Sequence, residues 1–375
     1  MESSSVYILL FSAFILAGII HLSWYLFTFS RLAFYKAREQ EYQKSPVSVI
    51  IAAKNEVVNL QKYLPSILEQ SYHDFEVIVV NDCSWDQTGE YLEEMQMKYA
   101  HLKVVTIPEQ DKYKHGKKFA ITLGVKAAKN EVLLFTDADC MPVGKNWIST
   151  MQRNLTTGKE IVLGYGAYQK EPQKFSALNR LIRFDTFIIA MQYFSFALQG
   201  NAYMGVGRNL CYRKSLFFRT KGFANHYHLF SGDDDLFVNE NATSDNVAVQ
   251  IEKESFTVSD PKKTFREWFG QKSRHGSTAN YYKAKHRFQL ALLSISEFLF
   301  IALLITLLIL RYKWESVLGI YVCKLVAEWL ISFSASKKLN EQDLMWLYPF
   351  LKISMILLQP VFYLSAILNR QQAWK

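Results

Sequence analysis

Long apolar stretches lie at both ends of the chain. A transmembrane helix needs about 20 apolar residues, and four stretches reach or approach that length: 6–29, 288–310, 317–333 and 347–368. The first has no charged residue and lacks the basic start and cleavage site of a signal peptide, so we expect a retained anchor. Glu297 and Glu328 lie inside two of the others. Because a carboxylate in lipid is costly, both should face other helices or the membrane interface.

Between these stretches, residues 46–260 alternate short β-branched runs with segments of helical periodicity. The runs that we predict as strands are 47–52, 75–80, 102–107 and 132–136. After the first run, Leu60, Leu64 and Ile67 recur at helical spacing, and Asp86 can cap the second predicted helix. A repeat of strand and helix predicts a parallel sheet covered by helices on both faces. The predicted fold class is therefore α/β.

Composition and charge narrow the classes of function. Of the 375 residues, 50% are hydrophobic and 15% aromatic, which favours a protein that lies partly in lipid. The net charge of +9 suits a membrane surface or an anionic substrate. Nucleic acid is not an expected partner, because the basic residues are scattered along the chain. The four cysteines are far apart without CxxC spacing, so neither a zinc site nor a disulfide framework is indicated.

The distribution of cations predicts the orientation in the membrane. Four of them follow the first apolar stretch closely: Arg31, Lys36, Arg38 and Lys44. By the positive-inside rule, the N-terminus should be outside and the central domain cytoplasmic, at the plasma (inner) membrane. Three later spans then return Lys337 and Lys338 to the cytoplasm. The same topology leaves four cations outside, against the charge bias: Arg311, Lys313, Arg370 and Lys375.

Polar residues concentrate where the predicted strands end. Ala53, Asn55 and Glu56 follow the first strand, Asp82 follows the second, and 137–139 follow the fourth. In parallel sheets a ligand sits beyond the carboxyl ends of the strands, where the strand order reverses. With the common order 3-2-1-4, all three loops line one crevice. Each of these residues alone could cap a helix or form a turn, but three such loops together favour a binding site.

Asp137 and Asp139 form the most informative pair of this set. An apolar strand delivers two carboxylates separated by Ala138, whose small side chain leaves room for a ligand. Two hard oxygen ligands so placed suit Mg²⁺ or Mn²⁺, which can bridge the phosphates of a donor and neutralise a diphosphate leaving group. We expect Asp139 as the main metal ligand, with Asp137 shared between metal and ribose. The competing interpretation is a capped turn.

These segments resemble the inverting, membrane-associated glycosyltransferases of family 2 with a GT-A domain, the group that contains cellulose, chitin and hyaluronan synthases. The resemblance rests on Val47–Glu56, Val79–Ser84 and the Asp-Ala-Asp segment. It implies a UDP-sugar donor, whose base and ribose lie in the first loop and whose uracil is read by Asp82. His115–Thr122 is similar to the family's Gly-Lys stretch, which implies that Lys117 approaches the diphosphate. Taken alone, Lys117 would be an ordinary solvated lysine.

Two further segments resemble the family's sugar and acceptor sites. Gly205–Asn209 is similar to the glycine-containing loop below the sugar, although a plain turn is an alternative. Ser231–Leu236 resembles the segment that carries the general base, which an inverting transfer needs to take the proton of the acceptor hydroxyl. Alignment on Gly232 gives this role to Asp234, and an alternative register gives it to Asp233. Outside the family, the same residues would be an acidic helix start.

The segment from Gln271 to His275 resembles the family's QxxRW element on an interfacial helix. Gln271 and Arg274 would contact donor phosphate, whereas His275 replaces the tryptophan that stacks on the acceptor sugar in polymerising members. This departure argues against processive polymer synthesis. Residues 175–200 mix charged and aromatic side chains, which fits an interfacial amphipathic helix, with a buried core helix as the alternative.

The sequence therefore predicts a membrane-bound hexosyltransferase that moves a sugar, with inversion, from a UDP-sugar to a lipid-linked or saccharide acceptor, in the making of a glycolipid or cell-envelope polysaccharide. The expected parts are an anchor, a catalytic domain, an interfacial segment and three membrane helices: 1–30, 31–260, 261–287 and 288–375. Three alternatives remain open. They are a processive polysaccharide synthase, a non-catalytic sugar-nucleotide sensor on the same fold, and a transporter, which would leave the polar loops unexplained.

Overall fold

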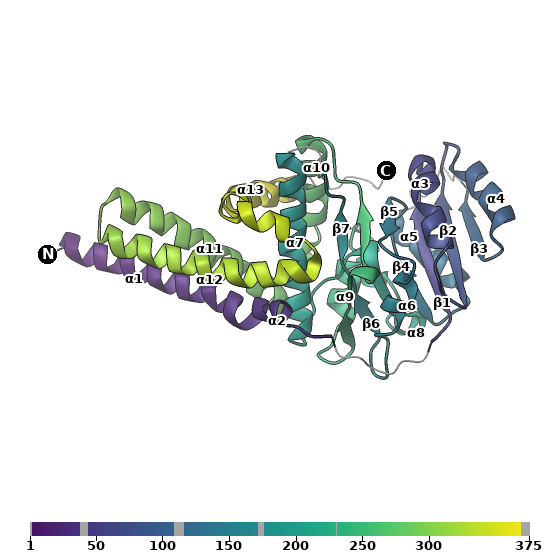
Figure 1. Cartoon of the computed structure of the whole chain (residues 1–375), viewed down its shortest axis with the longest axis horizontal. Coiled ribbons are helices and arrows are strands. Elements are labelled where there is room, and N and C mark those ends of the chain that lie inside the picture. The colour runs from purple at the N-terminus through teal and green to yellow at the C-terminus, as the bar shows by residue number, and fades with distance from the viewer. Residues whose placement is uncertain (1, 38–43, 109–115, 172–175, 230, 369–375) are drawn as a thin grey trace.

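The computed structural model describes residues 2–37, 44–108, 116–171, 176–229 and 231–368. A long helical bundle lies on one side of the molecule and an α/β domain on the other (Figure 1). Several residues used in the sequence interpretation lie outside the described residues: Arg38, His115, Phe175, Arg370 and Lys375.

The central sheet of the domain has seven strands in the order β3-β2-β1-β4-β8-β6-β9. Their bounds are β1 Val47–Ala53, β2 Phe75–Asp82, β3 Leu102–Ile107, β4 Val132–Phe135, β6 Ile161–Leu163, β8 Leu210–Arg213 and β9 Val247–Val249. Strand β1 pairs in parallel with β2 and β4, and β2 pairs in parallel with β3, whereas β8 runs antiparallel to β4 and β6. The predicted parallel half with the order 3-2-1-4 is thus confirmed.

Helices cover both faces of this sheet because both faces of β1 are apolar. Val49 and Ile51 pack with Leu64 on one side, whereas Ile50 packs with Ala120 on the other. A strand buried on both faces reads as a continuous apolar run, which is typical of parallel sheets. The helices of the domain are α3 Val57–Leu68, α4 Thr88–Lys98, α5 Lys117–Ala127, α6 Trp147–Gln152, α8 Lys214–Arg219 and α9 Asp235–Asn241.

A second, three-stranded sheet has the order β5-β10-β7 and was not predicted. Its strands are β5 Cys140–Pro142, β7 Gly166–Tyr168 and β10 Thr257–Ser259. Ser259 pairs with Cys140 on one side and with Tyr168 on the other. Strands of three residues carry no periodic signal, so only their long-range pairing reveals them. The sheet therefore places Cys140 and Tyr168 on its two outer strands, on either side of Ser259.

Five helical segments are long and apolar enough to cross a membrane. Four of them coincide with the predicted stretches: Ser5–Ala33, Ala284–Ile309, Trp314–Leu339 and Gln342–Ala366. Their elements are α1 Glu2–Ser23, the π-helical turn η1 Trp24–Phe29, α2 Ser30–Ala33, α11 Ala284–Ile309, α12 Trp314–Leu339, η6 Gln342–Leu347 and α13 Tyr348–Leu368. The fifth, α7 (Ala177–Leu198), lies between the bundle and the domain (Figure 1), and 67% of its most apolar window is buried. It is therefore mainly a buried helix.

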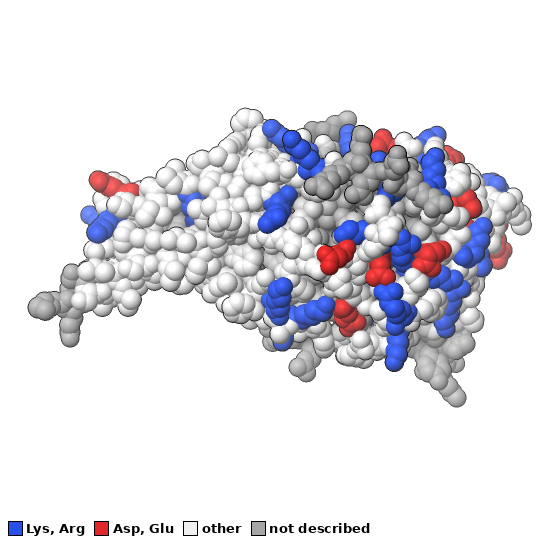
Figure 2. Space-filling model, turned by 90° about the horizontal axis from the view of Figure 1, so that it is seen from below, with Lys and Arg blue, Asp and Glu red and all other residues white. Residues whose placement is uncertain are grey.

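The remaining helix of the domain, α10 (Phe265–Gly276), packs against α13. The short helical turns are η2 Gly207–Asn209, η3 Ala224–His226, η4 Lys253–Ser255 and η5 Ala279–Tyr281. Figure 2 shows that the bundle surface is mostly free of charged side chains between its far tip and the domain. Large apolar side chains are exposed there, among them Leu9, Phe27 and Ile309. An uncharged apolar band of this kind fits a lipid environment.

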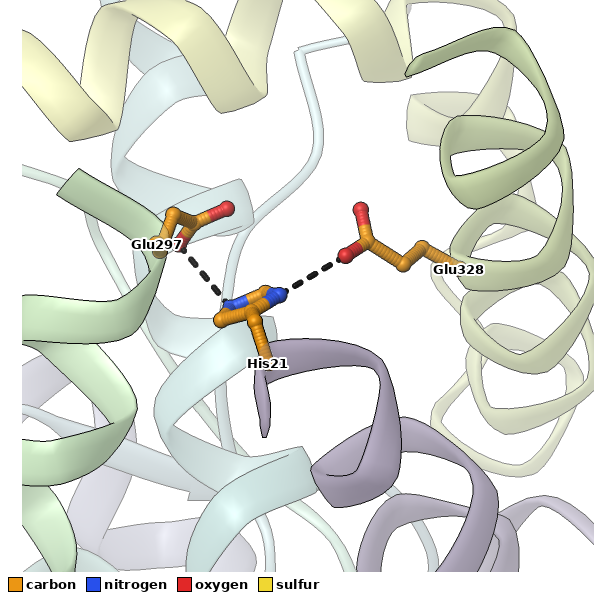
Figure 3. A group of neighbouring side chains, drawn as sticks. All are labelled: His21, Glu297 and Glu328. Atoms are coloured by element: carbon orange, nitrogen blue, oxygen red, sulfur yellow. Dashed lines mark hydrogen bonds and ion pairs between the residues drawn. The ribbon is translucent and has the colours of Figure 1, made fainter. Parts of the chain in front are cut away.

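The two glutamates inside the apolar stretches face other helices, as the sequence predicts. His21 of α1 lies between Glu297 of α11 and Glu328 of α12, at 3.4 Å and 2.8 Å (Figure 3). Lys352 of α13 pairs with Glu297 at 2.8 Å and also with Glu328, which in turn pairs with Lys324 at 2.5 Å. Because His21, Lys324 and Lys352 come from three different helices and surround these carboxylates, the cluster joins α1, α11, α12 and α13.

Candidate functional site

Hydrogen bonds connect the loop after β1 with the loop after β2. The Asn55 N–H donates to Ser84 Oγ at 2.9 Å, and the Trp85 N–H donates to Asn55 Oδ1 at 2.9 Å. The Glu56 N–H donates to Thr88 Oγ1 at 3.0 Å. Asn55 has φ +55°, a left-handed conformation that Asn tolerates better than most residues. These contacts give the predicted nucleotide loop a defined shape at the carboxyl edge of the sheet.

Asp86 caps two helices at once. Its carboxylate accepts the Thr88 N–H at 3.0 Å at the start of α4 and the Val57 N–H at 3.3 Å at the start of α3. The predicted cap is therefore present and serves the neighbouring helix as well. Ala53 ends β1, and Asp82, the last residue of β2, is buried. All these residues lie at the edge of the sheet where the polar loops were expected.

Lys117 holds two acidic segments together. It is the first residue of α5, and its ammonium lies 2.8 Å from Asp137 and 3.0 Å from Asp233. Burial alone would lower the pKa of Lys117, but the carboxylates of Asp137, Asp233 and Asp234 raise it well above its ordinary value. Burial would raise the pKa of Asp137, but the Lys117 ammonium more than offsets this and lowers it. Lys117 is therefore a fixed positive charge between the end of β4 and the acidic loop.

Asp139, the second carboxylate of the pair, belongs to a group of side chains that could hold a metal ion. Ligand atoms of Asp137, Asp139 and Cys140 lie within 4.8 Å of one another. Burial raises the pKa of Asp139, and the negative charge of Asp137 raises it further. A cation bound between the two carboxylates would relieve their repulsion. Burial also raises the pKa of Cys140 well above its usual range, so its thiol keeps its proton. The two carboxylates, and not the thiol, are thus the candidate ligands for a hard cation.

Arg208 is a charged residue of the site that the sequence interpretation did not single out. It lies in η2, with its guanidinium 4.4 Å from the centre of the Tyr168 ring. It donates to Ser259 Oγ at 3.0 Å and to the Ala167 carbonyl at 3.3 Å. Its positive charge opposes the effect of burial on the pKa values of Asp137 and Asp139. Its position inside the glycine-containing segment was the available signal, but the stacking partner comes from the unpredicted small sheet.

Gly207 brings the backbone close to the carboxylates. Its N–H donates to Asp234 Oδ2 at 2.7 Å. A Cβ at this position would lie 3.3 Å from Asp234 Oδ2 and 3.3 Å from Lys117 Nζ, which is tight. The absence of a side chain therefore allows the loop to approach the site. A pocket at this point is lined by residues of five segments, among them Ala52, Lys117, Asp137, Gly207, Asp233 and Asp234.

The two candidate bases differ in their surroundings. Asp233 is buried and ion-paired with Lys117. Asp234 precedes α9, and its Oδ1 accepts the Asp235 N–H at 2.7 Å. Burial and then the charges of Asp233 and Asp235 raise the pKa of Asp234 to about 7. Asp234 is thus a carboxyl group that can gain and lose a proton near neutral pH.

Comparison with known proteins identifies the family of the central domain. Residues 48–219 match the family model described as glycosyl transferase family 2. The central domain belongs to this family. Glycosyltransferase AglE of Haloferax volcanii is 32% identical over 121 residues, which are 32% of this chain and 38% of that protein. A 4,4'-diaponeurosporenoate glycosyltransferase of Staphylococcus haemolyticus is 40% identical over 108 residues, which are 29% of this chain and 28% of that protein. The chain thus spans well under half the length of these relatives.

A solved structure shares the fold of this family 2 domain and of much of the remaining chain. It is a mannosyltransferase from Pyrobaculum calidifontis in complex with GDP-Man and Mn²⁺, with a TM-score of 0.55 at 16% identity. The match covers 94% of this chain and 98% of that chain. The GT-A fold expected from the sequence is therefore confirmed.

Helix α10, which carries the predicted QxxRW-like element, reaches the site indirectly. A capping box of Thr264 and Glu267 begins α10. Gln271 Nε2 lies 3.1 Å from the Tyr168 hydroxyl. The guanidinium of Arg208 stacks on the ring of the same tyrosine. Among the residues that the structure describes, neither Gln271 nor Arg274 lines the pocket. Their predicted contact with donor phosphate remains a prediction.

Proposed function

We propose that the protein transfers a hexosyl unit, with inversion, from a nucleotide-diphosphate sugar, in the first place a UDP-sugar, to a lipid-linked or saccharide acceptor at the membrane. One observation carries the proposal. A single pocket combines the carboxylate at the end of β4, the ammonium of Lys117 and a carboxyl group, Asp234, with a pKa of about 7. These are the groups that donor binding and acceptor deprotonation require.

The donor side consists of Asp137, Asp139 and Lys117. The two carboxylates would hold Mg²⁺ or Mn²⁺, and such an ion neutralises the charge of a departing diphosphate. Lys117 is 2.8 Å from Asp137, so it can add a second positive charge to the same leaving group. The loops with Asn55, Glu56 and Asp82 lie at the same sheet edge and would take the nucleoside. The related mannosyltransferase fold with GDP-Man and Mn²⁺ supports this class of donor.

On the side of the sugar acceptor, the reaction needs a general base that takes the proton of the attacking hydroxyl. Asp234 is a better candidate than Asp233, because the Asp233 carboxylate is ion-paired with Lys117 and is therefore less available to the hydroxyl of an acceptor. The elevated pKa of Asp234 matches the Brønsted requirement for a base that works near neutral pH. Asp234 accepts the Gly207 N–H, which fixes the orientation of its carboxylate toward the pocket.

Several features support an acceptor that arrives from the bilayer with the domain in the cytoplasm. Five helical segments can span a membrane, and α7 and α10 lie between the bundle and the sheet (Figure 1). Cations are numerous at the domain end of the bundle: Arg31, Lys36, Lys283, Lys285, Arg287, Lys337 and Lys338. Only Arg311 and Lys313 lie at the turn between α11 and α12. This asymmetry favours a cytoplasmic domain at the plasma (inner) membrane.

The deciding experiment is a donor panel with the full-length protein in membranes. UDP-sugars and GDP-mannose are supplied with Mg²⁺ or Mn²⁺, nucleotide release is measured, and labelled products are identified by mass spectrometry. We expect release that depends on metal, is abolished by EDTA, and is lost in Asp139→Ala. Asp234→Asn should still bind donor but form no product. If no donor gives release above the Asp139→Ala control, the transferase proposal is wrong, and donor binding without release would indicate a sensor.

The size of the product distinguishes two kinds of transferase. His275 stands where polymerising relatives have tryptophan, and its side chain is exposed. We therefore expect one discrete glycosylated product. A ladder of long products would show a processive synthase instead.

A further inference from the structure

The two neighbouring carboxylates of the acidic loop, Asp234 and Asp235, point to different parts of the molecule. Asp234 faces the pocket through its hydrogen bond from the Gly207 N–H. Asp235 accepts hydrogen bonds from the hydroxyl groups of Thr278, at 2.5 Å, and Tyr282, at 2.7 Å. Both donors belong to the segment that connects α10 with the membrane helix α11. The acidic loop is thus bound to the pocket on one side and to the start of a membrane helix on the other.

A second contact strengthens this connection one helical turn later. Asn239 lies four residues after Asp235, so both project from the same face of α9. Its Oδ1 accepts the Lys283 N–H at 2.8 Å, and its Nδ2 lies 3.0 Å from Nδ1 of His286, in the first turn of α11. The same Nδ2 donates to the Tyr203 carbonyl at 2.7 Å. The face of α9 that carries Asp235 is therefore attached to the first turn of α11.

The burial of the contact between Asp235, Thr278 and Tyr282 suggests that it orients the acidic loop rather than adding to the stability of the fold. Asp235 is 8% exposed, Thr278 2% and Tyr282 8%. The carboxylate is satisfied here by two hydroxyl groups and by the Leu236 N–H at 2.7 Å. A buried acidic group of this kind is commonly no more stabilising than a well-packed apolar residue. A hydrogen-bonded carboxylate does, however, fix an orientation that apolar packing leaves free.

We propose, as an extension of the transferase function above, that Asp235 is a positioning residue, which ties the loop of the base Asp234 to the start of membrane helix α11 through Thr278 and Tyr282. The base then keeps a fixed position relative to the helix that leads into the bilayer, from which the acceptor arrives. Asp235 also acts through its charge. Burial raises the pKa of Asp234, and the carboxylates of Asp233 and Asp235 raise it further, whereas Lys117 and the Gly207 N–H lower it.

The first test separates this role from a merely structural one by the pH profile of kcat. Asp235→Asn keeps the shape and one acceptor oxygen but removes the charge, so the acidic limb should move to lower pH by about half a unit or more. Tyr282→Phe keeps the charge and removes a hydrogen bond, so kcat should fall by about tenfold with the donor KM unchanged. The matched control is Tyr281→Phe, because Tyr281 is adjacent but 55% exposed, and it should behave as wild type.

The second test does not depend on turnover. Hydrogen–deuterium exchange of the full-length protein should be faster at residues 231–241 in Tyr282→Phe and Thr278→Val than in wild type or Tyr281→Phe. If these variants leave the exchange unchanged, Asp235 is not a positioning residue. If Asp235→Asn leaves the acidic limb of the kcat profile where it is in wild type, the charge of Asp235 does not act on Asp234. If exchange responds as expected but wild type releases no nucleotide from any donor, the contact stands and the transferase proposal fails.

Discussion

At the scale of single residues, Lys117 forms ion pairs with two acidic segments of the site. It lies within 3.0 Å of both Asp137 and Asp233, which belong to segments far apart in the chain. Without its ammonium, these two carboxylates would repel each other across the pocket. The sequence offered Lys117 only through a family resemblance, whereas the structure gives it two charged partners. A lysine between two carboxylates can both hold the two acidic segments together and meet an incoming diphosphate.

We predict that Lys117→Met lowers kcat/KM for the donor by about a hundredfold or more, because a preorganised positive charge at a leaving group is worth about 3 kcal/mol. The measurement is nucleotide release as a function of donor concentration. The control is Lys126→Met on the same helix, where the side chain is exposed and the rate should not change. Equal rates for the two variants would contradict a role for Lys117 at the diphosphate.

The pKa of Asp234 predicts the pH dependence of the reaction. A general base must be deprotonated, and the pKa of this carboxyl is raised to about 7. Activity should therefore be present above pH 7 and fall as the pH drops below it, unlike a base with the ordinary Asp pKa of about 3.9. The profile of kcat between pH 5 and 9 tests this. A rate that stays constant down to pH 5 would be inconsistent with Asp234 as the base.

At the scale of elements, the helical bundle is held by charges as well as by apolar contacts. His21, Lys324 and Lys352 surround the carboxylates of Glu297 and Glu328 (Figure 3). Removal of one partner from a buried ion pair leaves the other charge without compensation, at a cost of about 3–5 kcal/mol. The position of Glu328 inside an apolar stretch signalled a partner, but only the packing of four helices shows which residues those partners are.

Glu328→Gln should therefore destabilise the bundle by about 3 kcal/mol, because Lys324 and Lys352 lose an anion. The unfolding of the detergent-solubilised protein, followed by heat or denaturant, measures the loss. Glu315→Gln is the control, since Glu315 is exposed at the start of the same helix. If both variants unfold together with wild type, the cluster contributes nothing to stability.

At the scale of the whole molecule, the apolar band and the asymmetry of cations predict which end lies in the cytoplasm. In a background without Cys83 and Cys323, a cysteine at Glu315 should react with a membrane-impermeant maleimide on intact cells. A cysteine at Glu93, exposed on α4, should react only after permeabilisation. The reverse pattern would place the domain outside.

The sequence by itself determined the parallel half of the sheet and the four apolar spans. Those features depend on local patterns, namely β-branched runs, helical spacing and uninterrupted hydrophobicity, which each segment carries within itself. It also determined which strand ends carry polar loops, because a loop follows its own strand. The order 3-2-1-4 then brings these loops to one edge.

Only the tertiary structure decided the contacts that cross between segments. The short strands of the second sheet bring Tyr168 and Ser259 to Arg208. The ion pair with Lys117 distinguishes Asp233 from Asp234. Their adjacent positions in the sequence do not show this difference. The link from Asp235 to Tyr282 joins residues 47 positions apart. Each of these contacts depends on the meeting of side chains from distant segments, and a local pattern in the sequence does not encode which distant residue will be the partner.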